Sequence, residues 1–144
     1  MNKATHMKPL LLNIRLIEMI GASNLAGQIE ISGGRCVLPT GLEPITIPTV
    51  GLAECSSTAR LENKTTIHAV SLKARLCSDL LLIYRRAAYI LHTVTGEQYL
   101  LGIGEQPHPV LLKSLDMPSS PADPSGWQIS INWESPVGLL AIVG

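Results

Sequence analysis

Apolar and polar residues alternate with a period of two along much of this chain. The clearest stretch is Thr65–Leu76, where one side of the pattern holds Val70, Leu72, Ala74 and Leu76 and the other holds Ser71, Lys73 and Arg75. Successive side chains of a strand point to opposite faces of a sheet, so this stretch predicts a strand with one buried and one solvated face. Leu52–Leu61 is its predicted partner in a hairpin that turns at Glu62-Asn63-Lys64.

Glycine-containing turns predict two further hairpins. Residues Ala87–Val94 and Glu97–Ile103 are β-prone arms on either side of Thr95-Gly96, and Gln28–Ser32 and Arg35–Leu38 flank Gly33-Gly34. Glycine adopts the positive φ angles of tight hairpin turns at little cost, which is why such pairs between β-prone arms indicate hairpins.

Three more segments read as strands. In the segment 10–20 one parity is shared by Leu10, Leu12, Ile14, Leu16 and Ile20, which predicts a half-buried strand. A helix is the alternative there, since Leu12, Leu16, Met19 and Ile20 also fit a period of 3.6. Near the end of the chain, one face of a predicted strand carries Trp127, Ile129, Ile131 and Trp133, and residues 139–143 form a last apolar run.

Proline and glycine predict loops at residues 39–51 and 117–126. Residues 78–86 fit either a strand or a short helix capped by Ser78 or Asp79, and the pattern slightly favours the helix. We therefore predict a mainly β chain with a single domain over residues 1–144. Its expected architecture is an antiparallel β-sandwich or barrel of about seven or more short strands.

Composition adds that the surface is poor in charge. Of the 144 residues, 46% are hydrophobic and only 15% are charged, against roughly 25% in a typical soluble domain. Either a partner covers part of the surface or the surface is built from uncharged polar residues. Eleven basic and eleven acidic residues give a formal charge of zero, so no nucleic-acid partner is predicted.

Targeting and redox signals are weak. The early apolar run is interrupted by Asn13, Arg15 and Glu18, and no stretch approaches the length of a membrane span, so the chain is predicted to be soluble, cytoplasmic when made, and not inserted in a membrane. The three cysteines are Cys36, Cys55 and Cys77, without a CxxC spacing. Such a set fits a reducing compartment and predicts no disulfide framework or zinc ribbon.

Candidate catalytic, cofactor-binding and metal-ligating residues do not assemble into a motif. The four histidines, His6, His68, His92 and His108, lack ligand spacing, and His68 and His92 are interpreted as core or interface residues. Gly102-Ile103-Gly104 is a lone GxG that we interpret as a bend, and no serine among Ser56, Ser57, Ser119 and Ser120 lies in a GxSxG motif. Cys55 and Cys77 are interpreted as small buried hydrophobes. No catalytic, cofactor or metal site is predicted.

Two clusters leave alternatives open. The face that carries Trp127 and Trp133 is either core or a stacking platform for a glycan, and core is favoured. Lys73, Arg75, Arg85 and Arg86 form a modest basic cluster that fits a solvated face or the rim of an interface.

The segments Tyr99–Pro109, YLLGIGEQPHP, and 127–140, WQISINWESPVGLL, resemble small neck and tail proteins of tailed phages and prophages, such as head–tail connectors and tail terminators. The resemblance lies mainly in residues 87–144. It implies a β-rich fold, rings formed through strand addition and long loops, and no catalytic residues.

The leading hypothesis is therefore a non-enzymatic structural protein, made in the cytoplasm of a bacterial host and located in the virion. It would act as a homo-oligomer, in a ring, against neighbouring virion proteins. One alternative is a small-ligand or glycan-binding β-domain that uses the Trp127/Trp133 face. A second alternative is a small enzyme whose site is assembled from distant residues.

Overall fold

The computed structural model describes residues 10–77, 86–116 and 126–143. Within these ranges one turn of 3-10 helix, η1 (Ala22–Asn24), accompanies eleven strands. The strands are β1 (Leu10–Gly21), β2 (Glu30–Ser32), β3 (Arg35–Val37), β4 (Ile45–Thr46), β5 (Thr49–Glu62), β6 (Thr65–Leu76), β7 (Ala87–Thr93), β8 (Gln98–Leu101), β9 (Val110–Asp116), β10 (Gly126–Ser135) and β11 (Leu140–Val143).

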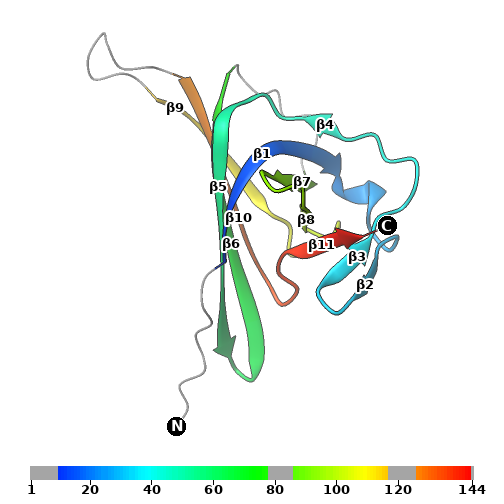
Figure 1. The fold of residues 1–144 in the computed structure, drawn as a ribbon. Helices are drawn as coiled ribbons and strands as arrows, with labels where there is room; N and C mark the ends of the chain where they lie inside the picture. The colour runs from blue at the N-terminus through cyan, green and yellow to red at the C-terminus, as the bar shows by residue number, and fades with distance from the viewer. Residues whose placement is uncertain (1–9, 78–85, 117–125, 144) are drawn as a thin grey trace.

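All strands belong to one sheet with the order β2-β3-β11-β8-β7-β1-β5-β6-β10-β9, and β4 pairs with β1 (Figure 1). The mainly β class predicted from the sequence is confirmed. The expectation of a purely antiparallel sheet is wrong in one place, because β11 pairs parallel to β3. Strand β11 lies between β8 and β3. It runs antiparallel to β8, and in that direction it is parallel to β3.

Strand β1 turns the sheet back on itself. Its first residues, Leu10–Ile14, pair with β5, whereas its second half pairs with β7 after a bulge between Ile14 and Leu16. A bulge inserts an extra residue and bends the strand. The buried parity therefore changes from Ile14 to Ile17 and Met19, and the prediction of one shared parity over residues 10–20 is wrong.

The main core lies between the two halves of the bent sheet. It combines side chains from β1, β5, β6, β7, β8 and β10, and its members at 0% exposure are Ile17, Leu72, Leu91, Leu101 and Ile131. A second, smaller core covers the other side of β7 and β8, where η1 and the following loop bring in Leu25. The core is mainly aliphatic, as expected for a chain with no phenylalanine.

The three predicted hairpins are confirmed. They are β2–β3, β5–β6 and β7–β8. The tight turns need positive φ angles, which Gly33 and Gly34 supply in the first hairpin and Asn63 and Lys64 supply in the second. The strands predicted at 10–20, 127–133 and 139–143 are also present, as β1, β10 and β11.

The predicted loop at 39–51 is shorter in the structure. Ile45 and Thr46 form β4 against β1, and β5 begins at Thr49. The physical reason is the burial of Ile47, whose backbone N–H donates to Ile17 O at 2.9 Å and ties the segment to the sheet.

The predicted loop at 117–126 lies outside the described residues except for Gly126, and the predicted helix at 78–86 lies outside them except for Arg86.

Candidate functional site

Five neighbouring strands, β1, β5, β6, β10 and β9, present one side to the main core and the other away from it. We call the second side the outer face. The strand registers align its side chains in rows across the sheet. One row is Leu11, Ser56, Ser71, Asn132 and Val110, and the next is Asn13, Glu54, Lys73, Ser130 and Leu112.

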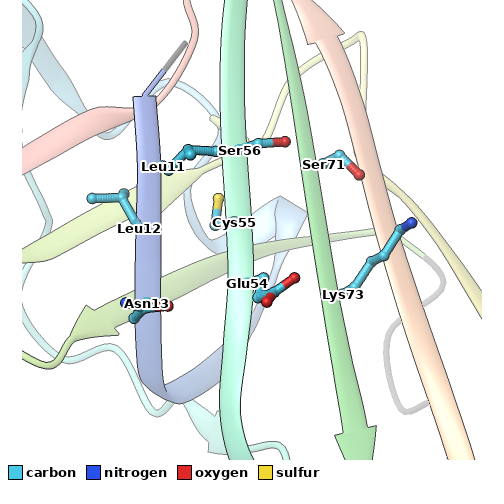
Figure 2. Close-up of a pocket in the computed structure, with 8 residues that line it drawn as sticks. All are labelled: Leu11, Leu12, Asn13, Glu54, Cys55, Ser56, Ser71 and Lys73. Carbon is cyan, nitrogen blue, oxygen red and sulfur yellow. The ribbon is translucent and has the colours of Figure 1, made fainter.

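The outer face is apolar at its two ends, and its middle combines small polar side chains with the charged Glu54 and Lys73. Leu11 on β1 is 74% exposed, and Val110 and Leu112 on β9 are 55% and 61% exposed. Figure 2 shows Leu11, Ser56 and Ser71 across neighbouring strands, with Glu54 and Lys73 in the row beside them. These residues contribute to a shallow hollow of about 510 Å³ over β1, β5 and β6.

The β5–β6 hairpin extends past the strands beside it. Among the described residues, β1 stops pairing with β5 at Ser57 and β10 stops pairing with β6 at His68, and the hairpin extends beyond both to its turn (Figure 1). We call residues 58–67 the arm.

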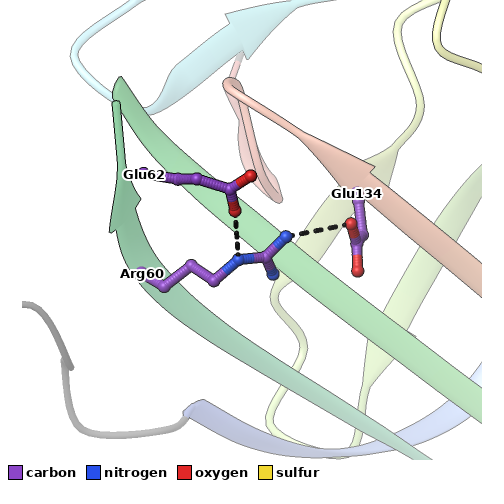
Figure 3. Close-up of polar contacts among 3 residues, drawn as sticks. All are labelled: Arg60, Glu62 and Glu134. Atoms are coloured by element: carbon purple, nitrogen blue, oxygen red, sulfur yellow. Dashed lines mark hydrogen bonds and ion pairs between the residues drawn. The ribbon is translucent and has the colours of Figure 1, made fainter. Parts of the chain in front are cut away.

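A charged network holds the base of the arm to the sheet. Arg60 Nε lies 2.9 Å from Glu62 Oε2, and Arg60 Nη2 lies 3.2 Å from Glu134 Oε1 on β10 (Figure 3). Hydrogen bonds to Glu62 and then Glu134 raise the pKa of the Arg60 guanidinium. The arm is therefore connected to the outer face in two ways, through the backbone of β5 and β6 and through the side-chain contact between Arg60 and Glu134.

The histidines do not come together in one pocket. His92 Nε2 lies 2.6 Å from Glu18 Oε1 in a part-buried pair, on the side of β7 opposite the core residue Leu91. His68 lies on β6, where a Cβ at Gly138 would approach His68 Cγ to 2.7 Å. Within the described ranges, no group of three or more His, Cys, Asp or Glu side chains is placed to hold a metal ion.

The two tryptophans differ in accessibility. Trp133 is 2% exposed and its Nε1–H donates to Pro107 O at 2.8 Å, so its ring belongs to the main core. Trp127 is only partly buried, and Lys113 Nζ lies 4.9 Å from the centre of its ring. The buried ring of Trp133 is not available for stacking, so the pair does not form the two-tryptophan platform that a glycan-binding face would need.

The remaining candidates occupy separate places. Gly102 and Gly104 have φ angles of 99° and 83° and form the predicted bend after β8. Ser56 lies on the outer face, whereas Ser119 and Ser120 fall outside the described residues. Lys73, Arg75 and Arg86 are exposed, and Arg85 is outside the described residues.

The three cysteines are free, and their environments differ. Cys36 and Cys55 are buried, but Cys77 is exposed, so its interpretation as a buried hydrophobe is wrong. The alternation of β6 itself gives this result, because Leu72, Ala74 and Leu76 are buried and the odd positions 73, 75 and 77 are exposed. Burial raises the pKa of the Cys55 thiol to about 12 and also raises that of Cys36.

Alkylation of the native protein at pH 8 is expected to modify Cys77 alone. Thiolate is the reactive form, and a buried thiol with a raised pKa is both neutral and shielded. Intact-mass spectrometry after iodoacetamide treatment should show one adduct in the native protein and three after unfolding, and the Cys77→Ser variant should show none when native. An adduct on native Cys55 would contradict the burial of that side chain.

Sequence reasoning missed the two polar contacts that tie distant strands. Both Glu18–His92 and Arg60–Glu134 join residues separated by 74 positions. No local sequence pattern predicts either contact, because each depends on which strands become neighbours.

No helix among the described residues has the length and apolar character that crossing a membrane requires. Comparison with protein-family models, with curated proteins and with solved structures found no significant match to this chain.

Proposed function

We propose that this chain is a non-enzymatic assembly protein of a virion, a neck or tail component that works as a homo-oligomer. It is made in the host cytoplasm and ends in the particle, in a ring against neighbouring virion proteins. The observation that carries the proposal is the outer face, with exposed Leu11, Val110 and Leu112 at its ends and, between them, small polar side chains beside the oppositely charged Glu54 and Lys73. The resemblance of residues 87–144 to phage neck and tail proteins supplies the virion setting.

The ends of the outer face carry exposed apolar side chains, and lone monomers rarely keep a large apolar patch exposed. Interfaces of stable complexes gain apolar side chains, and Glu54 and Lys73 in the middle of this face are of opposite sign, so a contact between copies can pair them. A chain with a formal charge of zero also has no net repulsion between copies to overcome.

Light scattering after size exclusion tests the proposal on the full chain over a wide concentration range. We expect a discrete oligomer, or a mass that rises with concentration towards one. A strict monomer at the highest concentration would overturn the proposal of self-assembly.

A further inference from the structure

The two edges of the sheet are poor sites for adding a strand. The sheet order ends in β9 and in β2, and an open edge accepts a partner strand unless something blocks it. On β9, Lys113 is the register partner of the buried Ile129 and therefore points to the core side, with its Nζ 4.9 Å from the Trp127 ring centre. An inward-pointing charge is a known obstacle to strand addition, and β2 has only three residues.

The outer face is better suited to contact, because two of the rows at its centre carry small side chains on β5 and β6. Ser56 and Ser71 are register partners at its middle, and Thr58 and Ala69 follow in the next row. Small side chains let a second sheet approach to the usual separation of about 10 Å between packed sheets. Val50 shares the side of Arg75 by register and adds another exposed apolar side chain, 53% exposed.

The rows of the outer face supply part of the area that a stable dimer needs. Four rows, at Arg75, Lys73, Ser71 and Ala69, cross β5, β6 and β10. With about 4.8 Å between strands and about 6.8 Å between rows, these three strands cover on the order of 400 Å². A standard interface buries about 800 Å² on each partner, so a pair formed through this face also needs contacts from β1 and from the arm.

The charges on the face match those of a second copy. Glu54 and Lys73 are direct register partners on β5 and β6. A two-fold axis parallel to the strands and between β5 and β6 places each Glu54 over the Lys73 of the other copy, and each Ser56 over the other Ser71. Such a contact is isologous and closes as a pair. Arg60 and Glu134 are already paired within the chain, and Arg75 is a further exposed cation on this face beside Lys73.

We propose that the outer face packs against the outer face of a second copy, sheet on sheet, with Glu54 of each copy meeting Lys73 of the other. The inference rests on the proposed function, because it names the surface through which that assembly starts. Larger rings or stacks then use other surfaces of the resulting pair.

The test uses two charge-reversal variants of the outer face, studied separately and as a mixture. Glu54→Lys makes the face positive and Lys73→Glu makes it negative, so each variant alone places like charges opposite one another. We expect each variant to raise the dissociation constant of the pair at least about 100-fold, since like-charge contacts across an interface are strongly unfavourable. An equimolar mixture of the two variants should associate again, as a heterodimer, at concentrations near those of the wild-type protein.

Glu54 and Lys73 are also neighbours within one chain, and each substitution disturbs that intra-chain pair. Mixing the two variants cannot repair the intra-chain pair, so association in the mixture reports on the contact between copies. Glu30→Lys and Arg35→Glu, at exposed sites on β2 and β3, are matched controls that should leave the mass unchanged. Circular dichroism should show that every variant is folded.

The outcomes are distinguishable. A wild-type protein that stays monomeric overturns the proposed function. A wild-type oligomer that survives both reversals on the outer face overturns this inference and leaves the proposed function standing. Loss of association in both variants without rescue in the mixture overturns the pairing of Glu54 with Lys73.

Discussion

Replacing Gly104 with alanine is expected to lower the free energy of unfolding by about 3 kcal/mol or more. Gly104 has a φ of 83°, and a Cβ there would lie 2.6 Å from Ala22 O and 2.8 Å from both Ala26 N and Leu25 Cβ. The left-handed conformation costs a non-glycine residue roughly 1–2 kcal/mol, and overpacking against rigid backbone adds about 1–3 kcal/mol. The affected contact joins the bend after β8 to η1, which helps to close the second core.

Gly96→Ala is the matched control for this change. Gly96 has a φ of 94°, but nothing lies within 4 Å of a Cβ built there. It should therefore show only the conformational cost of about 1–2 kcal/mol. Urea denaturation followed by tryptophan fluorescence measures both variants. Equal losses would show that the close approach of Gly104 to η1 does not contribute.

Trp133→Ala is expected to cost about 3–5 kcal/mol, the usual range for removing a large aromatic side chain from a core. The ring is 2% exposed in the main core, and its N–H donates to Pro107 O at 2.8 Å. Trp133→Phe keeps an aromatic ring but removes the N–H that donates to Pro107 O. Loss of this hydrogen bond costs about 1 kcal/mol, in addition to the cost of the smaller ring. It should fall between the wild-type protein and Trp133→Ala.

Trp127→Ala is the internal comparison, because Trp127 lies on the same side of β10 but is only partly buried. Its loss should cost less than half as much as the loss of Trp133. Far-UV circular dichroism during urea denaturation is the suitable measurement, since the substitutions alter the fluorescence itself. A larger cost at position 127 than at position 133 would contradict the placement of Trp133 in the core.

The turns and the strand faces were predictable because they depend on neighbouring residues. Gly33-Gly34 supplies positive φ angles where the chain reverses, and alternation in β6 separates buried Leu72 from exposed Lys73 whatever strand lies beside them. For the same reason the outward residues of β6 and β10 could be named from the sequence, whereas strand β9, which carries Val110 and Leu112, was not predicted. The segment at 45–51 was misread because long-range contacts fold it against the sheet, and Cys77 was misread although the alternation of β6 already places it on the exposed side.

Beyond the three hairpins, only the tertiary structure decided which strands became neighbours. The bulge after Ile14 lets β1 pair with β5 at one end and with β7 at the other, and it changes which side chains of β1 are buried. The sequence determined the two faces of each strand, since alternation is a property of the extended backbone. The register of Glu54 with Lys73 follows from the β5–β6 hairpin, whereas the rows across β1, β5, β6, β10 and β9 and the pairing of His92 with Glu18 arose from register between distant segments, which is set by packing of the whole core.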